Sequence, residues 1–347
     1  MTKIAFFDTK PYDKESFLEL NKDYNFEFAF FENKLRPETI SLVDGADVVC
    51  AFVNDTLSSE VIDGLANRGV KIVALRCAGY NNVDFKAAYN KIHVVRVPAY
   101  SPYAVAEHAV ALMLALNRKI HKAFNKTRES NFTLFGLMGF DMHQKTAGVI
   151  GTGKIGKTLI GILKGFGMNV LASDAFPDTE SAQKMGYEYV SLDEIYAKSD
   201  IISLNCPLTK ETTHLINSDT ISKMKNGVMI INTGRGKLID TNALIEGLKS
   251  RKIGAAGLDV YEEESDYFFS DFSNDVLDDD KLARLLSFGN AIVTAHQAFF
   301  TKEAIYEIAK TTLDNIKFFF ENEELPNEIC YRCDKYPCNK GKNKRCF

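Results

Sequence analysis

Two hydrophobic periods alternate along this chain from its first residues. Short apolar runs, typical of buried strands, are followed by segments whose apolar residues recur at helical spacing. The first part of the chain is predicted to hold strands at residues 3–8, 47–52, 70–76 and 94–97 and helices at 14–21 and 59–68. This alternation is typical of a parallel sheet with helices on both faces.

A second series of strands begins at about residue 145. After the first of them, strands are predicted at residues 169–173, 201–205, 228–232, 255–258 and 291–294, a number that suits a complete Rossmann sheet. A long apolar-faced helix precedes the series, with Ser101 as its N-cap, Pro102 in its first turn and its end at about Asn117. A further helix at residues 302–320 is expected to return to the first domain.

A glycine motif of the form G-x-G-x-x-G opens the second series. Gly151 permits a tight turn, Gly153 lets a pyrophosphate approach the backbone, and Gly156 lets the following helix pack on the strand. The free N–H groups at the start of that helix favour the phosphate charge. Asp174 ends the next strand pattern, where a carboxylate binds ribose hydroxyls and repels a 2'-phosphate. The motif therefore predicts NAD rather than NADP.

The fold class predicted by these patterns is α/β, with two doubly wound parallel-sheet domains, Rossmann-like or flavodoxin-like, and a cleft between them. A chain of 347 residues is long enough for two such cores. The expected substrate (catalytic) domain covers residues 1–100 plus 300–330, the NAD-binding Rossmann domain covers 101–299, and a Cys/Lys-rich tail covers 331–347. Hinges are expected at residues 98–102 and around His296.

Composition favours a small-molecule partner. Hydrophobic residues make up 46% of the chain and charged residues 25%, which is ordinary for a globular protein. The net charge of −4 supplies no broad basic surface for nucleic acid. The start of the chain lacks the pattern of an export signal, and the apolar stretch at residues 104–116 is too short to cross a membrane. A cytoplasmic location without membrane contact is expected.

The seven cysteines fall into two groups. Cys50, Cys77 and Cys206 are scattered and are expected to be reduced core residues. The others follow the spacing C-x2-C-x4-C-x7-C near the end of the chain: Cys330, Cys333, Cys338 and Cys346. Thiolates at short spacings can close a zinc shell, whereas the lysines and arginines between them are typical of a mobile basic tail. Both interpretations stay open, and the active site is assigned no metal.

Three groups suited to reducing a 2-oxo acid follow three strands of the second series. Arg235 lies in Asn-Thr-Gly-Arg-Gly, where its planar fork can bind a carboxylate through two N–H groups. His296 follows the last strand, and the segment between them contains Asp259 and the glutamates at 262–264. Because open α/β sheets bind ligands at the carboxyl ends of their strands, these loops are expected to converge. Reduction needs such a cation, a proton donor and a group that keeps the donor charged.

Together these motifs resemble the D-isomer-specific 2-hydroxyacid dehydrogenase family over residues 1 to about 330. Within the family, several segments are most similar to the fermentative D-lactate dehydrogenases: residues 97–102, 166–168, 205–208, 224–227 and 273–275. The resemblance implies that Arg235 binds the substrate carboxylate and polarises the carbonyl, and that His296 delivers the proton. Glu264 would keep His296 protonated and Asp259 would tune the pair, although the neighbouring glutamates at 262 and 263 leave the identity of the partner open.

The resemblance also implies contacts to cofactor and substrate. Cofactor contacts are expected at Gly151, Gly153, Lys154, Ile155, Gly156, Asp174, Cys206, Pro207, Thr233, Gly234, Arg235 and Asp259. Substrate contacts are expected at Ala78, Gly79, Tyr100, Arg235, His296 and Phe299. Backbone N–H groups at Ala78 and Gly79 would meet the carboxylate. Tyr100 and Phe299 would enclose a short side chain, although packing in the core explains such aromatics equally well.

The preferred function is therefore NADH-dependent, reversible reduction of pyruvate to D-lactate. Reduction of hydroxypyruvate, glyoxylate or phenylpyruvate on the same scaffold is an alternative, and so is a non-catalytic NADH-sensing protein. Retention of all three chemical groups favours an enzyme. Family precedent implies a homodimer or homotetramer, for which the helix from Ser101 and its extension through Phe124 offer a pairing surface.

Overall fold

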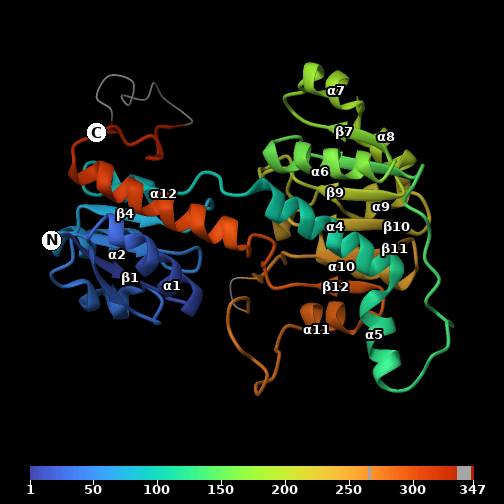
Figure 1. Cartoon of the computed structure of the whole chain (residues 1–347), viewed down its shortest axis with the longest axis horizontal. Coiled ribbons are helices and arrows are strands. Elements are labelled where there is room, and N and C mark those ends of the chain that lie inside the picture. The colour runs from blue at the N-terminus through green and yellow to red at the C-terminus, as the bar shows by residue number, and fades with distance from the viewer. Residues whose placement is uncertain (265–266, 334–344) are drawn as a thin grey trace. The chain divides into compact units, whose positions relative to one another are not determined.

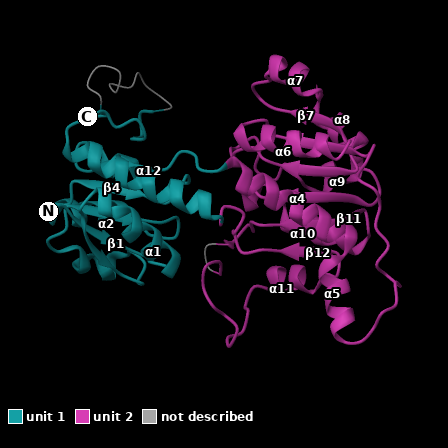
Figure 2. Ribbon diagram, in the orientation of Figure 1, with its two compact units in different colours: residues 1–101, 301–347 teal, residues 102–300 magenta. Residues whose placement is uncertain are grey.

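The chain forms two compact units in the computed structural model, which describes residues 1–264, 267–333 and 345–347. One unit contains Met1–Ser101 and Thr301–Phe347, and the other contains Pro102–Phe300. Figure 1 labels their helices and strands, and Figure 2 colours the two units separately. Each unit has its own parallel sheet. The predicted fold class, α/β with two parallel-sheet domains, is confirmed.

The first unit is built on a five-stranded sheet in the order β2-β1-β3-β4-β5. Its strands are β1 (Lys3–Phe6), β2 (Glu27–Phe30), β3 (Val48–Ala51), β4 (Ile72–Leu75) and β5 (His93–Val95). Its helices are α1 (Pro11–Leu20), α2 (Ser59–Asn67), α3 (Phe85–Ala88) and α12 (Lys302–Phe320), with 3-10 turns at Asn21–Asp23 and Pro37–Val43. Strands β3 and β4 are buried along their whole length, which is why they read as continuous apolar runs.

Apolar residues of α1 and α12 cover this sheet. Phe17 of α1 meets Phe6 of β1 edge to face, with ring centroids 4.9 Å apart. Leu313 and Ile316 of α12 join the same cluster, although α12 is far from the sheet in sequence. The late helix predicted at residues 302–320 therefore does return to the first unit, as expected.

The second unit is built on a seven-stranded sheet in the order β12-β11-β10-β9-β6-β7-β8, and every pairing within it is parallel. Its strands are β6 (Thr146–Ile150), β7 (Asn169–Ser173), β8 (Glu188–Tyr189), β9 (Ile201–Leu204), β10 (Val228–Asn232), β11 (Ile253–Leu258) and β12 (Ala291–Val293). Its helices are α4 (Pro102–Arg118), α5 (Ile120–Arg128), α6 (Lys154–Gly165), α7 (Thr179–Met185), α8 (Leu192–Lys198), α9 (Ser218–Lys223), α10 (Thr241–Lys249) and α11 (Asp280–Ser287), with a 3-10 turn at Gly236–Leu238. All carboxyl ends of the strands therefore lie along one edge.

Two apolar clusters hold this unit together. One joins α4 and α6 to the sheet, and the other joins α8, α9, α10 and α11 to it. Gly257 marks a close approach between a strand and a helix, because a Cβ there would lie 3.0 Å from Cβ of Leu112 in α4. The sheet is thus covered by two separate helix layers, as in a doubly wound fold.

The predicted elements and the structure differ at three places. Strands β2 and β8 have no counterpart in the sequence-based prediction: β2 is half exposed and β8 has two residues. The third difference follows the helix from Ser101, which ends near Asn117 as expected: the extension through Phe124 is helical but forms a separate helix. Lys119 has a φ of 52°, in the left-handed region, so α4 ends at Arg118 and α5 is a separate helix. Within the described residues, none of the helices is long and apolar enough to cross a membrane.

Candidate active site

The glycine turn lies between β6 and α6, at the carboxyl edge of the second sheet. Gly151 has a φ of 93°, and a Cβ there would lie 2.5 Å from the backbone nitrogen of Cys206. A Cβ at Gly156 would collide with the carbonyl oxygen of Gly151. Gly153 is the N-cap of α6, and a Cβ there would meet no atom within 4 Å. Gly151 and Gly156 are therefore required by close packing, whereas Gly153 faces open space at a helix N-terminus.

Asp174 follows β7, next to the glycine turn. Its carboxylate accepts hydrogen bonds from the backbone N–H of Thr152 at 2.6 Å and from that of Phe176 at 2.9 Å. Partial burial of Asp174 favours the neutral acid, but these hydrogen bonds outweigh it and hold the pKa of the carboxyl below its ordinary value. Asp174 is therefore ionised at neutral pH and half exposed at this strand end.

The ends of β9 and β10 add unpaired polar atoms to the same edge. Among the described residues, Asn205 Oδ1 and Thr233 Oγ1 are buried without a hydrogen-bond partner. Cys206 and Pro207 follow Asn205, and Gly234 and Arg235 follow Thr233, so these expected cofactor contacts lie on the two loops, whereas Asp259 follows β11. An open glycine cradle, an ionised acid and unpaired polar atoms fit the phosphates, ribose and amide of a dinucleotide.

The carboxyl ends of β10, β11 and β12 are joined by backbone hydrogen bonds. Asp259 N–H donates to the carbonyl of Asn232 at 2.9 Å, and His296 N–H donates to the carbonyl of Asp259 at 2.8 Å. The side-chain amide of Asn232 donates to the carbonyl of Arg235 at 2.9 Å. Arg235, Asp259 and His296 thus belong to one bonded framework, because three adjacent parallel strands end there.

His296 and Glu264 form a direct pair. His296 Nδ1 lies 3.0 Å from Glu264 Oε1, and the two side chains are 23% and 25% exposed. The other oxygen of Glu264 accepts a hydrogen bond from the backbone N–H of Tyr261 at 3.0 Å. These contacts fix the carboxylate and leave Nε2 as the imidazole nitrogen that faces away from it.

Glu262 has different partners. One of its oxygens lies 2.7 Å from His214 Nε2, and the other accepts a hydrogen bond from the hydroxyl of Thr241 at 2.7 Å. Burial alone would raise the pKa of Glu262, but the bonds from Thr241 and His214 lower it below the ordinary value. Of the glutamates that the sequence left open, Glu264 is therefore the one that the structure pairs with His296, and Glu262 closes a separate network.

Asp259 is fully buried and fixes the loop that carries His296. Its carboxylate accepts hydrogen bonds from the backbone N–H groups of Gln297 and Ala298, both at 2.9 Å, and from the hydroxyl of Thr294 at 2.5 Å. His108 of α4 contacts the same two side chains. Its Nε2 lies 3.1 Å from Thr294 Oγ1 and 3.4 Å from Asp259 Oδ1. The carboxylate thus binds the segments on both sides of His296.

Arg235 has few partners. Its Nη1 donates to the carbonyl of Gly234 at 2.8 Å, and the residue is half exposed. Across the described part of the chain, Arg235 has no hydrogen bond or ion pair to His296 or Glu264. Most of its N–H donors therefore remain available for a ligand.

The expected substrate residues of the first unit lie in loops after β4 and β5. Ala78 and Gly79 are half exposed, and the carbonyl of Ala78 accepts a hydrogen bond from Arg96 Nη1 at 2.8 Å. Arg76, at the start of this loop, is buried between the rings of Phe6 and Phe52. The loop is thus held by two arginines. Tyr100 is half exposed, and Phe299, in the second unit, is buried beside Phe300.

Comparison with known proteins identifies the family. The model for the NAD-binding domain of the D-isomer specific 2-hydroxyacid dehydrogenases matches residues 110–298, the part that contains the glycine turn and the His296–Glu264 pair. The chain belongs to the D-isomer specific 2-hydroxyacid dehydrogenase family. The resemblance seen in the sequence, the NAD cofactor and the enzyme class, an NAD-dependent D-2-hydroxyacid dehydrogenase, are thereby confirmed.

Several named relatives are similar over nearly their whole length. The 2-hydroxyacid dehydrogenase homolog of Haemophilus influenzae is 56% identical, with 90% of this chain and 95% of the relative covered. D-lactate dehydrogenase of Escherichia coli is 52% identical, with 94% of this chain and 99% of the relative covered. A solved structure titled as the pyruvate reductase of Chlamydomonas reinhardtii is 45% identical with a TM-score of 0.89, and covers 94% of this chain and 98% of its own.

Sequence reasoning missed two residues of this family member's site, His108 and Thr294. The sequence pattern places Thr294 only at the end of a predicted strand and His108 only within a predicted apolar helix. A histidine on the apolar face of α4 was the available signal, because such a side chain needs a polar partner. The partner, Asp259, is distant in sequence, so the pattern alone did not identify it.

One cavity of the second unit lies elsewhere. Its lining includes Leu116, Gly227, Gly254 and Asn290, which place it by the end of α4 and the amino-terminal ends of β10–β12. None of the expected catalytic, cofactor or substrate residues lines it. The expected site residues therefore lie at the strand ends and not around this cavity.

Proposed function

We propose that this dehydrogenase reduces pyruvate to D-lactate with NADH and also runs the reverse reaction. The observation that carries the proposal is the His296–Glu264 pair at the carboxyl edge of the sheet, one strand away from the available donors of Arg235. It is supported by relatives named D-lactate dehydrogenase and pyruvate reductase.

His296 acts as the proton donor in this proposal. Bound NADH supplies the hydride that adds to C2 of the substrate. Nε2 of His296 faces away from Glu264 and gives its proton to the carbonyl oxygen as negative charge develops there. The Glu264 carboxylate favours the charged imidazolium, and Asp259 positions the loop by bonding the backbone on its far side. In the reverse direction His296 takes the proton back.

Arg235 binds the substrate carboxylate. Its guanidinium offers parallel N–H donors and polarises the adjacent carbonyl, which favours hydride addition. The family resemblance further assigns substrate contacts to Ala78, Gly79, Tyr100 and Phe299, of which the two aromatic side chains would disfavour longer 2-oxo acids.

The test is to mix the protein with NADH and pyruvate and assay the enantiomer of the lactate formed. We expect D-lactate, with kcat/KM for pyruvate above that for hydroxypyruvate, glyoxylate and phenylpyruvate measured in parallel. A higher kcat/KM for one of those acids would reassign the substrate. Tight binding of NADH without oxidation by any of these acids would instead indicate an NADH-sensing protein.

We also propose that the enzyme works in the cytoplasm as a homodimer or homotetramer. No disulfide joins any of the described cysteines, which fits a reducing compartment. Large apolar side chains are exposed along α5 and the loop after it: Ile120, Phe124, Phe132, Leu134, Phe135 and Met138. All are 59–93% exposed, which favours burial against a second copy of the chain.

A further inference from the structure

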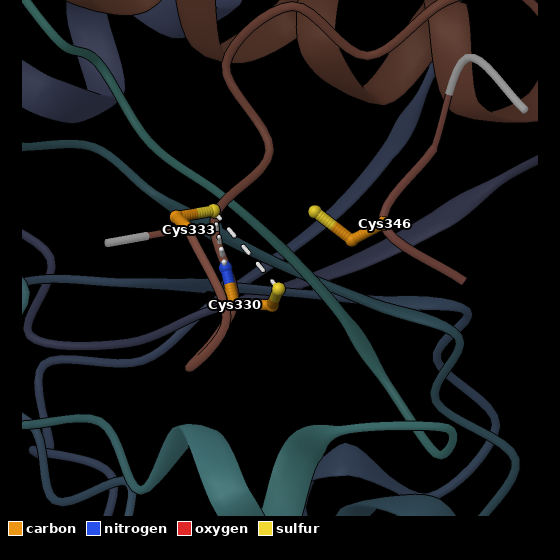
Figure 3. A group of neighbouring side chains, drawn as sticks. All are labelled: Cys330, Cys333 and Cys346. Atoms are coloured by element: carbon orange, nitrogen blue, oxygen red, sulfur yellow. Dashed lines mark hydrogen bonds between the residues drawn. The ribbon is translucent and has the colours of Figure 1, made fainter. Parts of the chain in front are cut away.

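Three cysteine thiols meet near the end of the chain. The sulfur atoms of Cys330, Cys333 and Cys346 all lie within 4.8 Å of one another. Figure 3 shows the three side chains turned toward a shared space, two from one short turn and the third from a separate segment. All three lie in the first unit, whereas the strand ends that carry the expected dehydrogenase chemistry belong to the second. The cluster therefore calls for its own explanation.

The turn at Cys330–Cys333 has the geometry of a thiolate ligand pair. Cys330 N–H points at Cys333 Sγ at 3.3 Å, and the two sulfur atoms are 4.0 Å apart. This N–H contact orients the sulfur, as the second contacts of metal ligands do. A tetrahedral zinc ion with Zn–S bonds of about 2.3 Å places its sulfur ligands about 3.8 Å apart. The pair needs only a small contraction to reach this distance.

Cys346 is held in place by the rest of the first unit. Its backbone N–H donates to Glu328 Oε2 at 2.6 Å, and the buried Glu328 is bonded through its other oxygen to His93 Nδ1. On either side of Cys346, the ring of Phe347 stacks on His93 with centroids 4.3 Å apart, and Arg345 donates to the carbonyl of Phe319. The third sulfur is therefore positioned by bonds that do not involve the other two, so the cluster is preorganised.

We propose that Cys330, Cys333 and Cys346 bind a structural zinc ion. Soft thiolates at tetrahedral spacing select zinc over calcium or magnesium. Cys338, which completes the predicted ligand spacing, lies outside the described residues, and the proposal rests on the three thiols that are described. The family resemblance in the sequence ends at about residue 330, so this site is separate from hydride transfer.

The ion would link two segments of the first unit. Cys330 follows Ile329, whose N–H donates to the carbonyl of Val94 in β5. Cys346 is held through its own N–H, which donates to Glu328. A metal bound only by the folded arrangement of these segments stabilises the folded unit, because its binding free energy adds to the free energy of unfolding. We expect its loss to lower thermal stability and to leave turnover at low temperature unchanged.

The first experiment measures metal in the full chain, expressed in zinc-supplemented medium and purified with a reductant and no chelator. We expect about one zinc per chain in the wild type. Cys333→Ser and Cys330→Ser should each reduce it by about tenfold, because a missing thiolate opens the shell. Cys50→Ala is the control and should keep its zinc, because Cys50 is buried in β3 and is not one of the three clustered thiols.

The second experiment excludes a disulfide. After denaturation with chelator and without reductant, we expect all seven cysteines of the chain to react with a thiol reagent. Cobalt(II) added to chelator-treated wild type should give thiolate charge-transfer absorption that Cys333→Ser lacks. Absence of zinc from the wild type, iron in its place, unchanged zinc in both serine variants, or a thiol count reduced by a disulfide would each overturn the proposal. These readouts do not involve NADH or pyruvate, so failure of the proposed function is seen separately.

Discussion

At the scale of single residues, the proposed proton transfer depends on the contact between His296 and Glu264. Glu264 Oε1 lies 3.0 Å from His296 Nδ1, and a carboxylate at this distance favours the imidazolium. Glu264→Gln keeps the size and removes the charge. For pyruvate reduction, which needs the protonated imidazole, the alkaline limit of kcat should therefore move to lower pH, with about tenfold lower turnover at neutral pH.

The measurement is a pH profile of kcat at saturating NADH and pyruvate. Glu262→Gln is the matched control, because Glu262 bonds to His214 and Thr241 and has no bond to His296. An upward shift for Glu264→Gln, or an equal downward shift for Glu262→Gln, would contradict the proposed roles.

Arg235 carries a second prediction at this scale. Arg235→Lys replaces a two-pronged donor with a point charge, which costs about 1.5–3 kcal/mol of transition-state binding and about 10–100-fold in kcat/KM for pyruvate. The loss should be mainly in KM, with some in kcat, because the guanidinium also polarises the carbonyl. Steady-state kinetics check this, with Arg36→Lys, an exposed arginine of the first unit, as control. Kinetics equal to wild type would remove Arg235 from the site.

How far the sequence predicts the site depends on the distance between partners along the chain. The glycine turn and the strand-end positions of Arg235 and His296 follow from local patterns, because the carboxyl ends of parallel strands share one edge. The choice among the glutamates at 262–264 does not, because adjacent residues differ only in where the loop directs them. The contact between His108 and Thr294 depends on the packing of α4 on the sheet. The hydrophobic periodicity of the sequence does not reveal this packing.

At the scale of elements, the tips of β6 and β7 are expected to set the choice of cofactor. Asp174 at the end of β7 accepts hydrogen bonds from Thr152 in the turn after β6, and its pKa lies below the ordinary value although burial opposes this. Because the pKa of Asp174 is depressed, these bonds stabilise the folded state at pH values above the unfolded pKa of 3.8. This stabilisation is lost as the pH falls through the folded pKa. The charge is thus present throughout the neutral range.

Asp174→Asn should weaken the preference for NADH over NADPH. The carboxylate is expected to bind ribose hydroxyls and repel a 2'-phosphate, so its loss should lower the ratio of kcat/KM for NADH to that for NADPH by about 10–100-fold. Parallel kinetics with the two cofactors measure the ratio. Asp219→Asn, on α9, serves as the control for loss of one surface charge. If the ratio is the same in Asp174→Asn and wild type, Asp174 is not the specificity residue.

Element prediction succeeded where burial imposed a pattern and failed where it did not. The strand at Val228–Asn232 is buried throughout and was predicted with the bounds that it has. Strand β2 alternates exposed and half-buried residues at a sheet edge, so its apolar signal is weak. The helix from Ser101 ends close to the expected residue Asn117, but the left-handed residue Lys119, which separates it from α5, has no glycine or proline to mark it.

At the scale of the whole molecule, the exposed apolar segment from Ile120 to Met138 predicts self-association. Separate exposed apolar side chains are normal on a monomer, but this segment gathers several of them within one helix and its following loop. A charge placed there would have to be buried in the proposed interface without a partner, which is costly. Phe135→Asp, at a side chain that is 93% exposed in the single chain, should therefore dissociate the assembly without unfolding it.

Light scattering during size-exclusion chromatography gives the mass directly. One chain has a mass of 38.8 kDa, so the wild type should show two or four times this value and Phe135→Asp should approach one chain at micromolar concentration. Val276→Asp is the matched control, because Val276 is 81% exposed and lies outside the segment. An interface made of identical surfaces carries each substitution twice. Phe135→Asp should therefore raise the concentration at which the chains dissociate well above that of the wild type. A monomeric wild type, or a Phe135→Asp protein with the wild-type mass, would show that this segment is not where the chains meet.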